Sequence, residues 1–189
     1  SENTIAVHVV NQQPSSRWYS GSGIYRDVKL SVTDKVHVAK YGTTITSPKL
    51  EEQQNGAVDT LVKSRIVNQD DQAHSIYAEY EIVDQNGQVV SEKVRSEVQS
   101  VLAGQELNLS HTLHVEKPTL WDVKTNNPAL YTLYTRVYRD SQLVDVQKER
   151  FGYRYLNWTP EGGFFLNGAA TKFHGVSLHH DHGALGAEE

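Results

Sequence analysis

A cluster of titratable side chains stands near the end of the sequence, in the run from His179 to His182 that follows the strand-like stretch 172–178. His180 and His182 are two residues apart on an extended segment, so both could reach one metal ion. Metal sites need orienting partners and usually a third ligand, and the sequence offers none that can be assigned. The interpretations left open are a solvated loop and a substrate-binding loop at the end of a strand.

The same region supplies the residue types of a catalytic triad, in Ser177, His179 and Asp181. Neighbours in sequence rarely have triad geometry, and the strand–turn–helix pattern of a nucleophile elbow is absent. Nucleophilic catalysis by Ser177 is therefore not predicted.

A second candidate is the loop from Asn11 to Arg26, where Trp18 and Tyr19 follow Arg17. Aromatic rings stack on the C–H faces of sugars, while planar polar groups such as guanidinium and amide bond hydroxyls. The composition of this loop suits a sugar. It equally suits a glycine-rich connection whose aromatic rings pack beneath it.

Two other segments favour structural roles. Leu120–Asp122, with the proline-bounded stretch 128–131, is typical of a packing anchor at the edge of a sandwich. In Phe151–Arg154, we expect Arg154 to pair with a carboxylate at a domain junction.

Composition excludes several classes of partner. The 189 residues carry a net charge of −5 and a pI near 6.0, without a basic run. Nucleic acid and anionic membrane are therefore not expected as partners. The sequence holds no cysteine, which removes disulfides, thiolate nucleophiles and cysteine metal sites.

The elements that position these candidates are β-strands, because apolar and polar residues alternate along most of the chain. The alternating stretches are 58–66, 76–82, 107–115 and 131–137, with short strands also expected at 7–10, 27–32 and 172–178. Asn86-Gly87 and Asn167-Gly168 predict hairpin turns with positive φ at both central residues, and Asp140-Ser141 predicts a polar turn.

This pattern predicts an all-β fold, an immunoglobulin-like β-sandwich of about seven strands flanked by strand remnants of neighbouring domains. We expect residues 1–35 to be the end of an upstream domain and 36–154 to form the sandwich. Residues 155–189 are expected to be a hairpin with the first strand and loop of a truncated further domain.

Several motifs together resemble glycoside hydrolase family 2, in its β-galactosidase-like branch. In chain order they are SGSGIYRDV (20–28), HVAKYGTTITSP (37–48), PTLWDVKTNNPALYTL (118–133), FGYR (151–154), GFFLNG (163–168) and HGVSLHHDHGALGA (174–187). The resemblance implies a parent enzyme with a jelly-roll sugar-binding domain, the sandwich and a (β/α)8 barrel. Residues 1–35 would then be the end of the jelly roll and 155–189 the start of the barrel.

Enzymes of this family are retaining exo-glycosidases with two glutamates about 5 Å apart, one a nucleophile and one an acid–base. In the family the acid–base glutamate follows an asparagine, and this chain has no Asn-Glu dipeptide. The resemblance therefore assigns no catalytic residue, no metal and no cofactor to the chain, which is expected to be inactive alone.

One site residue follows from the resemblance: His179, after the first barrel strand, matches a histidine that faces the sugar and helps stabilise the transition state. Asn11, Arg17 and Trp18 lie where the first domain of the family lends a loop to the active site. His180 and Asp181 depart from some relatives, and they are carried over only as neighbours of His179.

The expected partner is thus carbohydrate, a terminal β-galactoside bound by the parent enzyme. A β-glucuronidase or β-mannosidase parent, a free-standing carbohydrate-binding module and a structural sandwich stay open as alternatives. The sequence also leaves open a homo-oligomer and the cellular compartment.

Overall fold

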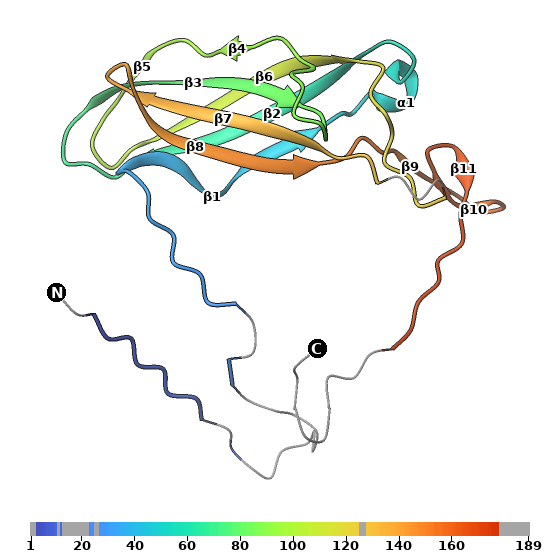
Figure 1. The fold of residues 1–189 in the computed structure, drawn as a ribbon, viewed down its shortest axis with the longest axis horizontal. Coiled ribbons are helices and arrows are strands. Elements are labelled where there is room, and N and C mark those ends of the chain that lie inside the picture. Colours follow the sequence, from blue (N-terminus) through green and yellow to red (C-terminus); the bar gives the residue numbers. More distant parts are fainter. Residues whose placement is uncertain (1–2, 11, 13–22, 25–26, 125–127, 178–189) are drawn as a thin grey trace. The chain divides into compact units, whose positions relative to one another are not determined.

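The structure is a computed structural model that describes residues 3–10, 12, 23–24, 27–124 and 128–177. The chain separates into two compact units, one of residues 32–172 and one of residues 1–31 with 173–189. The larger unit contains all of the assigned strands (Figure 1).

The first sheet is three-stranded and antiparallel, in the order β1-β2-β6. Its strands are β1 (Val36–Thr46), β2 (Ala57–Asn68) and β6 (Glu106–Glu116). The short helix α1 (Leu50–Gln53) connects β1 to β2 and buries Leu50.

The second sheet is five-stranded, and its main path runs β4-β3-β7-β8. Its strands are β3 (His74–Val83), β4 (Val94–Arg95), β7 (Tyr131–Arg139) and β8 (Gln142–Phe151), and β5 (Gln99–Val101) also pairs with β3. The two sheets lie face to face (Figure 1), which confirms the predicted all-β sandwich.

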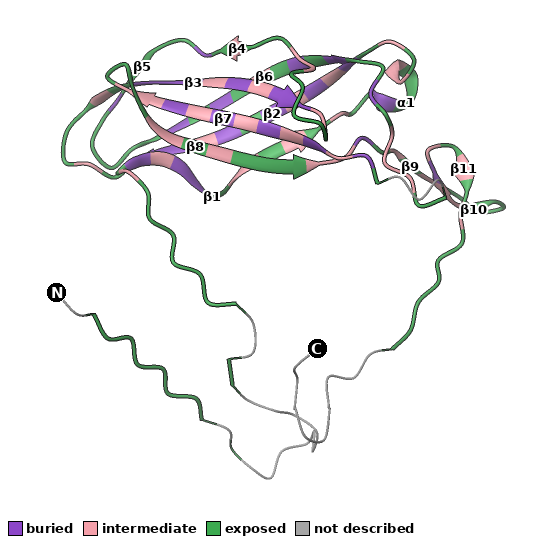
Figure 2. Ribbon diagram, in the orientation of Figure 1, coloured by how far each residue is buried: buried purple, intermediate pink, exposed green. Residues whose placement is uncertain are grey.

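The core lies between the sheets, and buried residues alternate with more exposed ones along β2, β6 and β7 (Figure 2). The side chains predicted to face inward do so because a strand directs every second residue to the same face. The largest fully buried ones are Tyr80, Tyr153, Leu50, Ile66, Ile76, Ile82, Leu113 and Leu133.

At the edge where β1 and β8 meet, a side chain of one strand bonds the backbone of the other. β1 and β8 are edge strands of different sheets, and the Asp145 carboxylate of β8 accepts a hydrogen bond from the Val38 backbone N–H at 2.9 Å. The unpaired backbone donor of β1 is thereby satisfied without a further strand.

Two of the three turns predicted from the sequence are observed as predicted, and the third has a different backbone conformation. Asn167-Gly168 (φ 50° and 77°) and Asp140-Ser141 (φ 49° and 68°) both form two-residue turns with positive φ at each central position. At Asn86-Gly87 only the glycine has a positive φ, of 79°. The prediction of a two-residue turn there was wrong, because the loop is wider and closes between Asp84 and Gln88 at 2.9 Å.

The Asn167-Gly168 turn belongs to a small third sheet, in the order β11-β10-β9, which confirms the predicted hairpin. Its strands are β9 (Leu156–Thr159), β10 (Gly163–Leu166) and β11 (Ala169–Ala170). This hairpin lies in the same compact unit as the sandwich.

The short strands expected at 7–10, 27–32 and 172–178 are not observed in the described residues 3–10, 27–34 and 172–177. Their apolar side chains are exposed; Leu30 is 87 % exposed and Val176 is 91 % exposed. Alternation alone does not make a strand, because its backbone groups need a hydrogen-bonded neighbour.

Candidate functional site

The sugar-contact residues predicted from the sequence, His179, Asn11, Arg17 and Trp18, lie outside the described residues, as do His180 and Asp181. The structure does describe the hairpin β9–β11, which immediately precedes the segment carrying His179. The candidate site is therefore built from the residues that hold this hairpin on the sandwich.

Asn167 attaches the hairpin to the loop before β7. Its side-chain Nδ2 donates to the Trp121 carbonyl at 2.9 Å, and its Oδ1 accepts from the Tyr155 backbone N–H at 3.1 Å. The Asn167 backbone N–H donates in turn to the Tyr155 carbonyl at 3.0 Å. Asparagine fits because its short amide can donate and accept, and because it tolerates the positive φ of the turn.

Trp121 is the packing anchor that the sequence predicted. Its backbone N–H donates to the Tyr153 carbonyl at 2.8 Å, and its side chain lies against Gly152, where an added Cβ would come within 3.0 Å of the Trp121 Cβ. The guanidinium of Arg154 lies 4.9 Å from the centre of the indole ring. No carboxylate partner of Arg154 is observed among the described residues, where its guanidinium lies over the indole ring of Trp121.

Polar contacts also join the hairpin to the rest of the sandwich. Gln54 Nε2 donates to the Tyr155 hydroxyl at 3.2 Å, and Asn157 Nδ2 donates to the Glu51 carboxylate at 3.2 Å. Lys124 Nζ donates to the Ala170 carbonyl at 2.7 Å. Residues 156–170 are thus held from several directions, so that the chain leaves the sandwich from a fixed position.

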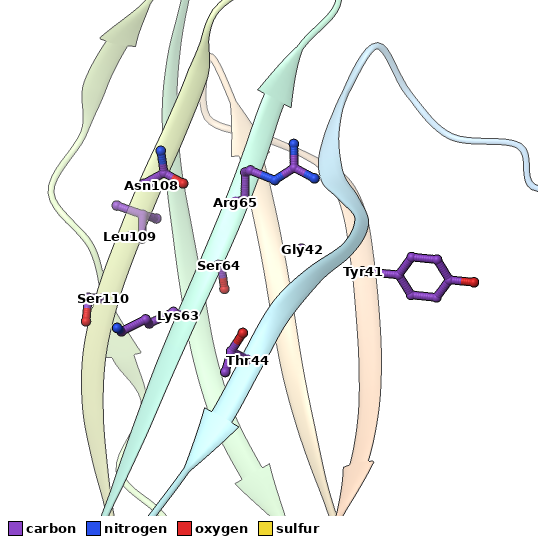
Figure 3. Close-up of a pocket in the computed structure, with 9 residues that line it drawn as sticks. All are labelled: Tyr41, Gly42, Thr44, Lys63, Ser64, Arg65, Asn108, Leu109 and Ser110. Carbon is purple, nitrogen blue, oxygen red and sulfur yellow. The ribbon is translucent and has the colours of Figure 1, made fainter.

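The surface depressions among the described residues include two on the sandwich. One lies over the three-stranded sheet where β1 is interrupted, with Tyr41, Thr44, Arg65 and Asn108 among its lining residues (Figure 3). The other extends from Pro48 to Arg150 and Arg154 and is lined also by Ile45, Thr46, Ser47, Leu50, Leu130, Phe151, Gly152 and Tyr153. In neither do two carboxyl groups face each other.

The titratable groups of the sandwich form two histidine–carboxylate clusters. In the first, His74 Nδ1 lies 2.7 Å from Asp140 Oδ2 and Nε2 lies 3.1 Å from Asp70 Oδ2. Bonds from Asp140 and Asp70 raise the pKa of His74, since both carboxylates favour the charged ring. The Lys35 ammonium, 2.8 Å from Asp70, is the main cause that lowers the pKa of that carboxyl.

In the second cluster, His114 lies between Glu92, at 2.9 Å, and Asp59, at 3.3 Å. Burial works against ionisation of Glu92, but hydrogen bonds from its own backbone and from His114 outweigh burial, so its pKa is lowered. A general acid needs a raised carboxyl pKa, and every resolved carboxyl shift among the described residues is downward.

The described residues contain no group of three side chains arranged to hold a metal ion. No helix in that part of the chain is long and apolar enough to cross a membrane. Sequence reasoning missed the attachments through Gln54, Asn157 and Lys124, since each joins residues that are far apart in the chain. Only Asn167, the asparagine of an Asn-Gly turn, gave a local signal.

Comparisons with known proteins identify the family. The model for glycosyl hydrolases family 2 matches residues 27–154. The chain is 41 % identical over 186 residues to beta-galactosidase BoGH2A of Bacteroides ovatus, covering 98 % of this chain and 21 % of that protein. It is 33 % identical over 190 residues to a putative beta-glucuronidase of Formosa agariphila, covering 98 % of this chain and 16 % of the relative.

Solved structures agree. A glycosyl hydrolase family 2 member from Bacteroides cellulosilyticus DSM 14838 superimposes with a TM-score of 0.81 at 32 % identity, covering 95 % of this chain and 24 % of that one. The chain spans about a fifth of the length of the curated relatives it matches. With the family model matched over most of the sandwich and the fold shared with solved members, the chain belongs to glycosyl hydrolase family 2.

Proposed function

We propose that this chain is the non-catalytic sandwich segment of a retaining exo-β-glycosidase that hydrolyses terminal β-galactosides. The observation that carries the proposal is the 41 % identity, over nearly the whole chain, to a protein named beta-galactosidase. Within the parent enzyme the sandwich is a spacer, and the two catalytic glutamates are supplied by residues outside this chain.

The electrostatics of the sandwich support an inactive role for the chain alone. Retaining hydrolysis needs one carboxyl that is protonated when it meets the glycosidic oxygen. Asp70 and Asp140 are held ionised by His74, and Asp70 also by Lys35. They therefore suit attachment between strands and not proton donation.

The attached hairpin supports the spacer role. On this proposal residues 1–35 end a sugar-binding domain, 36–154 form the spacer and 155–189 begin the catalytic barrel. The contacts of Asn167 and Lys124 hold the hairpin at the start of the 155–189 segment on the sandwich. In the parent, His179 contacts the sugar in the barrel, with Asn11, Arg17 and Trp18 on a loop of the first domain.

A β-glucuronidase parent is the second candidate, favoured by the relative at 33 % identity that carries that name. The two substrates differ at two positions of the sugar. A glucuronide carries a carboxylate where a galactoside carries a hydroxymethyl group, and its C4 hydroxyl is equatorial where that of a galactoside is axial. This chain offers no described site that would distinguish them, so the substrate is decided by measurement.

The test is hydrolysis of a panel of nitrophenyl glycosides by this chain and by a longer protein that contains it. We expect the longer protein to cleave the β-galactoside and this chain to cleave none. Cleavage of the β-glucuronide instead would favour the second candidate. Inactivity of both proteins on every β-glycoside would contradict the glycosidase proposal, and activity of this chain alone would contradict the spacer proposal.

A further inference from the structure

Three segments meet at the end of the sandwich where the chain enters it. They are residues 34–35 just before β1, the β2–β3 loop of residues 69–73 and the β7–β8 turn of residues 140–141 (Figure 1). We call these three segments the entry junction. Charged side chains connect them, and His74, the first residue of β3, lies between two of them.

His74 has a carboxylate at each of its ring nitrogens. Nδ1 lies 2.7 Å from Asp140 Oδ2, and Nε2 lies 3.1 Å from Asp70 Oδ2. An ionised carboxylate only accepts hydrogen bonds, so both contacts are bonds only when both nitrogens carry a proton. A neutral ring has one N–H, and its other nitrogen would direct a lone pair at a carboxylate oxygen. The geometry therefore requires the charged imidazolium.

The surroundings of His74 favour that charge. Its side chain is 12 % exposed, so solvent takes little part in satisfying the ring. The bond to Asp140 and then the bond to Asp70 are the main causes that raise the pKa of His74. Another ring at the junction is that of His37, whose Nδ1 lies 2.6 Å from the Asp34 carbonyl oxygen. Charged groups there include the carboxylates of Asp34, Asp70, Asp71 and Asp140 and the cations of Lys35 and Arg139.

The two bonds of His74 are not equivalent, because Asp140 is held more firmly than Asp70. The Asp140 Oδ1 accepts from the Ser75 backbone N–H at 3.0 Å, and the Asp140 backbone N–H donates to the Ser75 carbonyl at 2.8 Å. The contact of His74 with Asp140 is also the shorter one. When the imidazolium loses a proton, the remaining proton should therefore stay on Nδ1, and the lone pair should face Asp70.

Asp70 carries the effect to the residue before β1. Its Oδ1 accepts from the Lys35 ammonium at 2.8 Å and from the Asp71 backbone N–H at 2.8 Å. The Lys35 carbonyl in turn accepts from the Gln69 backbone N–H at 2.9 Å. A lone pair on His74 would repel the Asp70 carboxylate, and a displaced carboxylate would loosen the β2–β3 loop together with Lys35.

We propose that His74 is a proton-operated latch on the entry junction. While the ring is charged, it holds the β2–β3 loop against the start of β3. When the ring loses its Nε2 proton, the Asp70 side of the latch opens and the Asp140 side stays closed. The latch acts on residues 32–35, which follow the smaller compact unit in the chain, and it does not depend on which sugar the parent enzyme cleaves.

Nuclear magnetic resonance of the chain from about pH 5 to about pH 9 tests the latch. The nitrogen shifts of His74 should report a proton on both ring nitrogens at low pH and on Nδ1 alone after the titration. Hydrogen-exchange protection, taken relative to an unstructured peptide at the same pH, should fall about tenfold at residues 69–71 over that step. Protection at Ser75 and Asp140 should not fall. Equal protection of residues 69–71 before and after the titration, or a first loss at Asp140, would overturn the proposal.

Asp70→Asn reverses the chemistry at Nε2 and gives a second test. The asparagine amide can donate to the lone pair of a neutral ring, while its oxygen still accepts from Lys35. Protection of residues 69–71 should then rise as His74 loses its proton. A fall in the same direction as in the wild type would assign the effect to another group and overturn the latch.

His74→Gln should abolish the pH-dependent step in the β2–β3 loop, because the amide does not titrate. His114→Gln is the matched control, since His114 also lies between two carboxylates, those of Glu92 and Asp59, but in a separate cluster. The step should persist in this control. A step that survives in His74→Gln, or disappears in His114→Gln, would contradict the assignment to His74.

Discussion

The hydroxyls of Thr60 and Tyr153 share a 2.8 Å hydrogen bond in the core of the sandwich. Thr60 belongs to β2, whereas Tyr153 follows β8, so the bond connects the first sheet to the segment that leaves the second. Both side chains are almost fully buried, and burial raises the pKa of the Tyr153 hydroxyl, which stays neutral. This bond therefore anchors, on the sandwich, the segment from which the hairpin β9–β11 begins.

Removing one partner of that bond should destabilise the chain. Tyr153→Phe leaves the Thr60 hydroxyl buried and unpaired, at a cost of about 1–3 kcal/mol in the free energy of unfolding. Thr60→Val combined with Tyr153→Phe removes both polar groups, and it should cost less than the single change. Urea unfolding followed by circular dichroism measures the difference. Tyr41→Phe, at a residue 92 % exposed, is the control and should be neutral.

The His74 cluster should make stability depend on pH in two directions. The pKa of His74 is raised in the folded chain, so its contribution is full below the unfolded value near 6.5 and is lost as pH rises through the folded pKa. The pKa values of Asp70 and Asp140 are lowered, so their contributions are present above the unfolded value near 3.8 and are lost as pH falls. Stability from this cluster is therefore greatest between about pH 4 and 6.5.

His74→Gln should flatten this profile. Thermal unfolding at a series of pH values would show the wild-type midpoint falling above neutral pH, and the variant midpoint changing less over the same range. His174→Gln, at an exposed histidine, should keep the wild-type profile. An unchanged profile in the His74 variant would show that the two carboxylates do not depend on the imidazole.

A methyl group at Gly42 should disturb the interruption of β1. The new Cβ would come within 2.7 Å of the Ala39 carbonyl oxygen and 2.9 Å of the Arg65 carbonyl oxygen, closer than real side chains approach. Forcing the backbone aside should cost about 1–3 kcal/mol. Gly56→Ala is the matched control, since its nearest neighbour would be 3.9 Å away. Equal unfolding midpoints for the two variants would contradict the steric argument.

Loss of Asn167 should loosen the hairpin while the sandwich stays folded. Asn167→Ala removes the bonds to Trp121 and Tyr155 and places alanine at a positive φ. Hydrogen exchange should become faster in residues 156–170, with little change in β2 or β7. Asn157→Ala breaks only an exposed contact to Glu51 and should leave exchange nearly unchanged. Uniformly faster exchange across both sheets would mean that the hairpin and the sandwich open together.

The sequence predicted the core well, because alternation is a local property of a strand. Tyr80, Ile82 and Leu133 face inward as their spacing requires. The two Asn-Gly pairs show that the dipeptide alone does not determine the type of turn. Asn167-Gly168 forms the expected turn, but at Asn86-Gly87 the side chain of Asp84 accepts the backbone N–H groups of Asn86 and Gln88, which holds a wider loop.

Roles set by distant partners were not predictable in the same way. The spacing around Arg154 gives no sign of the Trp121 ring that it covers, since the two are far apart in sequence. The sugar-contact residues His179, Asn11, Arg17 and Trp18 stay predictions, because they fall outside the described residues.

The carboxylate of Asp145 that accepts the Val38 N–H has a consequence for how the sandwich behaves among its own copies. An open strand edge is a template on which another chain can add its own strand. Here the Asp145 carboxylate already accepts the Val38 N–H of β1, so an incoming strand would have to displace that carboxylate. The shift in the register of β1 between Val38 and Thr43 also interrupts the regular row of backbone groups on which a new strand could pair. The edge is therefore protected against the self-templated growth that turns exposed sheets into fibrils.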